Sequence, residues 1–257
     1  MDTALVVALM AGGVSLASAA ANVWSSRKNA ERASDNARAL ERLRAATEQE
    51  REKERRLLEI SRYSEPLAKA AYDLQSRIHN ILVRAFIDTF LVRGTPREKE
   101  YAVQNTAYVI SQFFCWSEIV RTDIQLISLE DDDETLKLSH LQDDISTLWS
   151  TDHHGPCLRV FSGEQRAIGE ALILSGAQGH RCLGYGAFLK TFTPGVEPLV
   201  DFLRSDIANL VNGSAPALDR LVSVQHKLID LLDLLDPEVV RFPRSRRSRV
   251  IPQLAAS

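Results

Sequence analysis

Residues 215–235, APALDRLVSVQHKLIDLLDLL, are the stretch that decides the fold class. Apolar side chains recur there every three or four positions, which is the period of one helix face, so the sequence predicts an amphipathic helix. The residue before a proline is biased away from helical geometry, and we expect this helix to end at Asp236-Pro237. The apolar face consists of Leu218, Leu221, Leu228, Leu232 and Leu235, with Val222 and Ile229 beside them.

Two longer helices are expected upstream. The first is predicted to run from Ser64, a capping residue, to Gly94, with Pro66 in its first turn. The second begins at Thr95, because Glu98 stands three residues later and completes a capping box. A turn this short predicts that the two helices pack as an antiparallel hairpin.

Shorter helices are expected to complete the body, which spans residues 63–237. Gly169 lies inside one of them, where glycine costs about 1 kcal/mol against alanine, so we expect it to permit a close helix crossing. Ser162 and Gln165 fit a capping box at the start of that helix. No run alternates convincingly as a strand does, and Leu158–Phe161 is better interpreted as a loop. The predicted fold class is all-α, an antiparallel helical bundle, with further helices near 135–150, 163–175, 185–192 and 197–212.

Residues 25–62 form a charged segment without glycine or proline. The segment is rich in Ala, Arg, Glu and Leu and is predicted to be one helical stalk. A short apolar stripe at Ala33, Ala37 and Leu40 stops before the charged run EQEREKERR at 48–56, so any coiled coil is short. We interpret the stalk as a solvated spacer. The alternative is a dimerisation stalk that makes the chain a homo-oligomer.

Residues 1–24 contain an uncharged, apolar run. From Thr3 to Trp24, TALVVALMAGGVSLASAAANVW, its 22 residues match the roughly 20 that a helix needs to cross a bilayer. Arg27 and Lys28 follow the run, and positive charge stays on the cytoplasmic side. The sequence therefore predicts a single-pass transmembrane anchor in the cell membrane, with the N-terminus outside and the C-terminal domain cytoplasmic. A cleaved signal peptide is the alternative, although the chain does not start with the basic residues that such a peptide needs.

The predicted body is acidic and lies between two basic segments. Residues 63–240 hold fifteen basic and twenty-five acidic side chains, a net charge of −10. Nucleic-acid-binding domains present a basic face, so nucleic acid is not expected as a partner. The last segment, 238–257, contains RFPRSRRSR at 241–249 and has no helical pattern. We expect it to be a basic, disordered tail.

The lipid bilayer is the first partner that this architecture predicts. A basic side chain near an anionic membrane surface is attracted to it by about 1 kcal/mol. The tail is therefore expected to reach anionic lipid beside the anchor. The residues expected to contact the membrane surface are Arg27, Lys28, Arg244, Arg246, Arg247 and Arg249.

Two short segments, DHHGPC at 152–157 and HRC at 180–182, hold residue types that bind metals. A tetrahedral zinc site can be drawn from them, but the spacings match no zinc signature, so we assign no metal and no cofactor. No Walker A, His-Glu-x-x-His or Gly-x-Ser-x-Gly pattern occurs, and no catalytic residue is assigned. Three cysteines fit a reducing compartment. The metal-site candidates are His153, Cys157, His180 and Cys182.

Several stretches of the body look familiar together: YSEPLAKAAYDLQSRIHNIL at 63–82, NTAYVISQFFCWSEIVRTDIQ at 105–125, FSGEQRAIGEALI at 161–173 and CLGYGAF at 182–188. They resemble a family of bacterial, actinobacterial-type membrane-anchored helical proteins of unknown function. The resemblance implies an all-helical fold and carries over no functional residue.

Two hypotheses for function follow. In the first, the chain is a membrane-tethered, non-enzymatic interaction or scaffold module that binds an unidentified protein. In the second, it is a membrane-anchored enzyme or effector that uses the Cys and His residues between 152 and 182. The second hypothesis requires those side chains to gather in one cleft.

Overall fold

The computed structural model describes residues 3–124, 133–176, 179–213 and 215–251. Within its helices, it does not describe the side chains of residues 3–21, 30, 53, 55–61, 123–124 and 133–135. The chain divides into two units, Met1–Leu58 and Glu59–Ser257, and each is described by itself.

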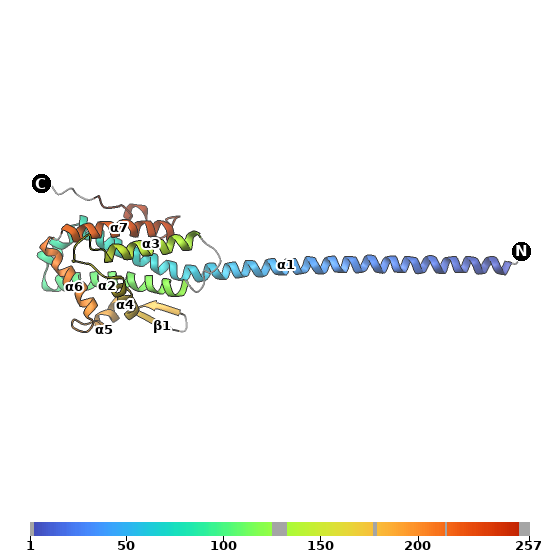
Figure 1. Ribbon diagram of the computed structural model, residues 1–257, viewed down its shortest axis with the longest axis horizontal. Coiled ribbons are helices and arrows are strands. Elements are labelled where there is room, and N and C mark those ends of the chain that lie inside the picture. The colour runs from blue at the N-terminus through green and yellow to red at the C-terminus, as the bar shows by residue number, and fades with distance from the viewer. Residues whose placement is uncertain (1–2, 125–132, 177–178, 214, 252–257) are drawn as a thin grey trace. The chain divides into compact units, whose positions relative to one another are not determined.

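The chain is predominantly helical, as predicted. Seven α-helices, three shorter helical turns and one two-stranded sheet make up the described residues (Figure 1). In order these are α1 (Thr3–Val83), η1 (Ile87–Val92), α2 (Pro96–Ile124), α3 (Asp133–Ser150), α4 (Ser162–Ala171), β1 (Ile173–Gly176), β2 (Gly179–Cys182), α5 (Tyr185–Thr191), α6 (Pro198–Asn209), η2 (Leu210–Asn212), α7 (Ala215–Leu235) and η3 (Arg244–Arg246).

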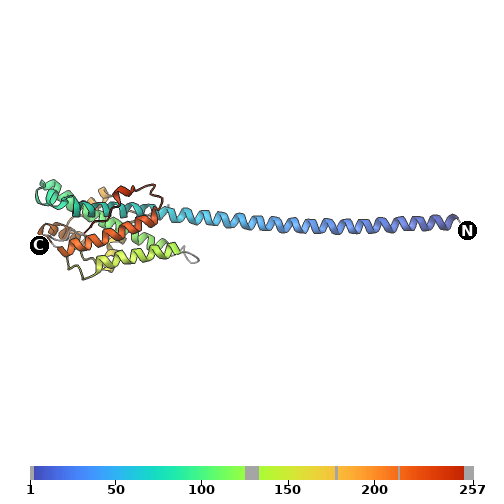
Figure 2. The same ribbon diagram turned by 90° about the horizontal axis from the view of Figure 1, so that it is seen from above.

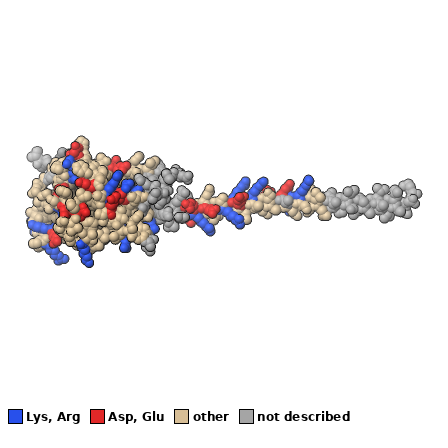
Figure 3. Space-filling model, turned by 60° about the horizontal axis from the view of Figure 1, so that its bottom comes forward, with Lys and Arg blue, Asp and Glu red and all other residues tan. Residues whose placement is uncertain are grey.

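All described residues of the first unit belong to α1. Every side chain described between Asn22 and Glu54 is exposed, so this stretch has no face buried by its own chain. Acidic and basic side chains alternate along it (Figure 3). The predicted stalk is thus helical, whereas its oligomeric state stays a prediction. Near its start, the Lys28 ammonium lies 4.8 Å from the centre of the Trp24 ring.

The first core helix does not begin at Ser64 as predicted. In the second unit α1 runs without interruption through Pro66 to Val83. A proline inside a helix removes one backbone hydrogen bond and usually breaks the helix. Here the flanking turns are fixed by packing, since Leu67, Ala70 and Ala71 are fully buried. Tertiary burial therefore outweighs the local signal.

The predicted end of that helix, Gly94, is also wrong. α1 ends at Val83, Ala85 takes a left-handed φ of 51°, and a π-helical turn follows over Ile87–Val92. The break places Phe86 and Leu91 in the core, both 7% exposed. Burial of these two side chains stabilises an irregular backbone that the sequence pattern does not reveal.

The predicted capping box at the start of α2 is confirmed. The Thr95 amide donates to Glu98 Oε2 at 2.8 Å, and the Glu98 amide donates to Thr95 Oγ1 at 3.4 Å. α2 lies antiparallel to the last turns of α1, as expected (Figure 1). The Arg77 guanidinium on α1 donates to Asn105 Oδ1 on α2 and connects the two helices.

The helix predicted over 215–235 is confirmed as α7. Leu221, Leu228, Ile229 and Leu232 lie in the core, each at most 3% exposed. α7 packs beside α3, and α4 crosses α2 (Figures 1 and 2). These helices together enclose one hydrophobic core in the second unit.

A β-hairpin follows α4, where the sequence predicted continued helix to 175. β1 and β2 pair antiparallel, with Ile173 opposite Cys182 and Gly176 opposite Gly179. The hairpin continues into α5 through Leu183, whose carbonyl accepts a hydrogen bond from the Tyr108 hydroxyl at 3.2 Å. Burial of Tyr108 raises its pKa to about 12. The predicted helix is thus four residues too long, and its C-terminal part is a strand.

The tail expected to be disordered is ordered over residues 238–251. Phe242 stacks on Tyr72 of α1 with ring centres 4.7 Å apart. The Arg247 side chain is 3% exposed and forms ion pairs with Asp233 and Asp236. Acidic side chains at the end of α7 thus neutralise the buried Arg247 of the segment that was expected to be a disordered tail.

Among the side chains that the structure describes, no helix contains a segment long and apolar enough to cross a membrane. The side chains of residues 3–21, which make up most of the predicted anchor, lie outside that set. The backbone from Thr3 onward is helical.

Candidate functional site

A groove between α4 and α6 lies beside two exposed phenylalanine side chains of the second unit. We call it the α4–α6 groove. Val160, Ile168 and Leu203 form its buried floor, and Phe161 and Phe202 stand on its rim at 51% and 68% exposure. It encloses about 210 Å³. A solvated pair of phenylalanines beside an apolar depression is typical of a protein-binding surface.

The rim at Phe161 is held by its neighbours. The Phe161 amide donates to Glu164 Oε2 at 2.8 Å, so Glu164 caps the start of α4. The Arg159 guanidinium lies 5.1 Å from the centre of the Phe161 ring. The predicted capping box of Ser162 and Gln165 is wrong by one residue, because Phe161 occupies the N-cap position and Ser162 is the first helical residue.

Asp206 supplies the charge at one end of the groove. Its Oδ2 accepts a hydrogen bond from the Leu158 amide at 2.7 Å. Burial raises the pKa of Asp206, although the Leu158 hydrogen bond and the charge of Arg220 oppose the shift. The Cys157 thiol is 3.8 Å from the Asp206 carbonyl oxygen. Burial, and then the charge of Asp206, raise the pKa of Cys157, so this thiol is not activated as a nucleophile.

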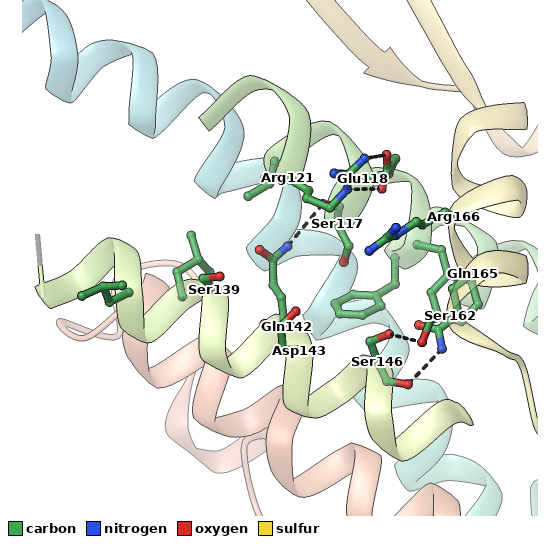
Figure 4. Close-up of a pocket in the computed structure, with 15 residues that line it drawn as sticks. Ser117, Glu118, Arg121, Ser139, Gln142, Asp143, Ser146, Ser162, Gln165 and Arg166 are labelled. Atoms are coloured by element: carbon green, nitrogen blue, oxygen red, sulfur yellow. Dashed lines mark hydrogen bonds and ion pairs between the residues drawn. The ribbon is translucent and has the colours of Figure 1, made fainter. Parts of the chain in front are cut away.

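A second depression, which we call the α2–α3–α4 cleft, encloses about 380 Å³ (Figure 4). Its floor is apolar and includes Phe113, Phe114 and Leu138. Polar side chains line its walls: Ser117, Glu118 and Arg121 from α2, Ser139, Gln142, Asp143 and Ser146 from α3, and Ser162, Gln165 and Arg166 from α4.

The polar groups of this cleft are mostly engaged with one another. The Arg121 Nε donates to Glu118 Oε2 at 2.8 Å, and this pairing raises the pKa of Arg121. Gln165 donates to the carbonyl oxygens of Ser146 and Val160. Arg166 has no ion-pair partner among the described residues and points into the cleft (Figure 4). The cleft thus offers one unpaired guanidinium and no activated nucleophile with a base beside it.

The predicted Cys and His candidates are distributed over different neighbourhoods. Cys157 lies against α6, whereas Cys182 lies on β2 and its thiol donates to the Leu183 carbonyl oxygen at 3.6 Å. The neighbouring Cys182 thiol and burial raise the pKa of Cys115. His153 is exposed on a turn, and His180 is half-buried on β2. Across the described ranges, no three or more His, Cys, Asp or Glu side chains lie close enough together to hold a metal ion.

The DHHGPC segment is held by an arginine that the sequence reasoning missed. Arg220 on α7 is 0% exposed and donates to four carbonyl oxygens at 2.7–3.0 Å. It closes the C-terminal end of α3 and fixes the following turn through the carbonyl oxygens of Thr151 and Gly155. The acceptors are Leu148, Trp149, Thr151 and Gly155.

The six basic residues expected to contact a membrane differ in their exposure and in their ion pairs. Arg27 and Lys28 are exposed on α1, and Arg244 and Arg246 are exposed on η3. Arg247 is buried, so it is not available to a membrane in this arrangement. Arg249, the sixth candidate, is exposed but forms an ion pair with Asp230.

Comparisons of the chain with protein-family models, with curated proteins and with solved structures find no match.

Proposed function

We propose that the chain is a membrane-tethered interaction module, in which the body binds a partner protein through the α4–α6 groove. The groove is the observation that carries the proposal. The Phe161 and Phe202 side chains are large and apolar, yet both are exposed. Burial of one such side chain contributes about 1.5–3 kcal/mol. A partner that covers both rings gains that free energy.

The tether rests on the sequence. The 22 uncharged residues from Thr3 to Trp24 are long enough to cross a bilayer, and Arg27 and Lys28 place the body on the cytoplasmic side. The helical residues 25–58 then act as a spacer between the anchor and the body. Arg244 and Arg246 are the tail arginines that we propose for contact with anionic lipid, because they are exposed and lack ion-pair partners among the described residues.

Membrane fractionation tests the tether. We expect the full chain to stay with membranes through an alkaline carbonate wash, and a chain lacking residues 3–24 to be released. A chain lacking residues 31–52 loses the same number of residues from the stalk and is expected to stay in the membrane. If the chain without 3–24 resists the wash as the full chain does, the tether is wrong.

Site-specific photo-crosslinking tests the groove. A photoreactive phenylalanine analogue at Phe202 is expected to crosslink one defined partner in native membranes, and Phe161→Ser is expected to abolish that product. The same analogue at Val83, which is exposed outside the groove, is the matched control and is expected to give no such product. An identical product from both positions, or one that survives Phe161→Ser, would remove the groove as the binding surface.

A further inference from the structure

The C-terminal segment lies in a site built for it. We call residues 240–251 the arm, and the side chains that hold it the seat. The arm runs antiparallel to α7, since Arg247 contacts Asp233, Arg249 contacts Asp230 and Val250 contacts Gln225. The seat comprises Glu65, Tyr72 and Gln75 on α1, Gln225, His226, Asp230 and Asp233 on α7, and Asp236 directly after it.

Two buried glutamines of the seat bind the main chain of the arm. Gln225 is 0% exposed; its Nε2 donates to the Ser248 carbonyl at 2.9 Å and its Oε1 accepts from the Val250 amide at 3.1 Å. Gln75, 1% exposed, donates to the Arg246 carbonyl at 2.9 Å. A buried amide without a partner is strongly unfavourable, so these side chains require the main chain of the arm beside them.

Other contacts select the side chains of the arm. Arg247 donates to Asp236 and Asp233, and Arg249 pairs with Asp230. Acids three residues apart along α7 thus meet arginines two residues apart along the arm, directly after η3. The seat thus complements both the main chain of residues 246–250 and the side chains of Arg247 and Arg249.

The connection between α7 and the arm is short and strained. It consists of Pro237, Glu238 and Val239, and Val239 has a left-handed φ of 56°. A β-branched residue in that region is an outlier that costs of order 1–3 kcal/mol. A short hinge under strain favours exchange of the following segment between copies, because the hinge relaxes while every contact of the segment is remade.

We propose that two copies of the chain exchange their arms, driven by the strained hinge, so that each arm occupies the seat of the other copy. The partner is a second copy of this chain. The inference does not depend on the proposed function, because neither the seat nor the hinge involves the α4–α6 groove or residues 3–24.

Isotope-resolved crosslinking of the full chain in detergent micelles tests the exchange. A small diazirine analogue of leucine replaces Val250, which is 9% exposed against the seat. Normal and ¹⁵N-labelled chains are mixed in equal amounts, and arm–α7 crosslinks are analysed by mass spectrometry. Free exchange is expected to give mixed-isotope products in about half of these crosslinks. Products that join only chains of the same isotope would overturn the proposal.

Matched variants assign the result to the seat and the hinge. Arg247→Ala with Arg249→Ala is expected to remove the arm–α7 crosslinks, whereas Arg244→Ala with Arg246→Ala removes equal charge and is expected to keep them. Val239→Gly relieves the strain and is expected to lower the mixed-isotope share of the crosslinks several-fold. An unchanged share would overturn the role of the hinge.

Phosphatidylserine vesicles test lipid as the alternative partner of the arm. We expect the arm–α7 crosslinks to persist when the vesicles are added, and complete loss of the crosslinks would assign the arm to lipid instead.

Discussion

Gly169 of α4 lies directly against the backbone of Phe114 in α2. A Cβ atom at position 169 would stand 2.7 Å from the Phe114 carbonyl oxygen and 3.0 Å from its carbonyl carbon. The sequence predicted this close crossing from a glycine inside a helix, and the prediction is confirmed. Since the atom in the way belongs to another helix backbone, α4 can accept a side chain only by moving away from α2.

We expect Gly169→Ala to destabilise the protein by about 1–3 kcal/mol, because the strain of overpacking exceeds the gain in helix propensity. Urea denaturation gives the free energy of unfolding. Gly163→Ala in the same helix is the control, since a Cβ there meets nothing within 4 Å and is expected to be neutral or slightly stabilising. Equal loss of stability in both variants would contradict this explanation.

Arg220 is expected to be among the most sensitive positions of the second unit. Arg220→Met keeps most of the buried volume but removes the donor to four carbonyl oxygens, of which, within the described part of the chain, only that of Trp149 keeps another donor, the Val160 amide. At roughly 1–3 kcal/mol for each unsatisfied buried group, we expect a loss of at least about 3 kcal/mol in the free energy of unfolding. Arg166→Met is the control: Arg166 is exposed and has no ion-pair partner in the described ranges, so a change within about 0.5 kcal/mol is expected.

Local signals predicted the parts of this fold that local interactions determine. The box of Thr95 and Glu98 and the apolar face of α7 both involve residues within a few turns of each other. Pro66 and Gly94 misled the prediction because contacts distant in sequence decide the backbone there. The hairpin is not predicted because its strands are four residues long and do not alternate.

The candidate surfaces were largely invisible in the sequence. Phe161 and Phe202 lie far apart along the chain, and nothing in their local pattern distinguishes an exposed phenylalanine from a buried one. Composition alone predicts a basic, disordered tail where the structure has the arm. Asp230 and Asp233 on α7 and Asp236 directly after it pair with the arm only because the chain returns antiparallel to α7, which the local sequence pattern does not reveal.

Docking of the arm is expected to weaken in acid through Asp236. Burial alone would raise the pKa of Asp236, but hydrogen bonds from the amides of Phe242, Val240 and Arg241, together with the charge of Arg247, hold it below its ordinary value. A carboxyl group with a lowered folded pKa stabilises the protein above its unfolded pKa of about 3.9, and this stabilisation is lost as pH falls through the folded value. Asp236→Asn is therefore expected to cost roughly 2 kcal/mol at pH 7 and progressively less below about pH 4. Free energies of unfolding from urea titrations at pH 3–7 measure the difference, and a cost that does not change with pH would contradict it.

Asp206 is expected to show the opposite sign. Burial raises its folded pKa, so the native carboxyl group binds a proton more readily than the unfolded one, and ionisation at neutral pH opposes folding. Asp206→Asn removes that charge, while the amide oxygen can still accept the hydrogen bond from the Leu158 amide. In the same titrations we expect this variant to be at least as stable as the parent at pH 7, with its advantage disappearing as pH falls to about 4. A clear loss of stability at pH 7 would instead mean that the Leu158 amide and the Arg220 charge stabilise the Asp206 carboxylate by more than burial destabilises it.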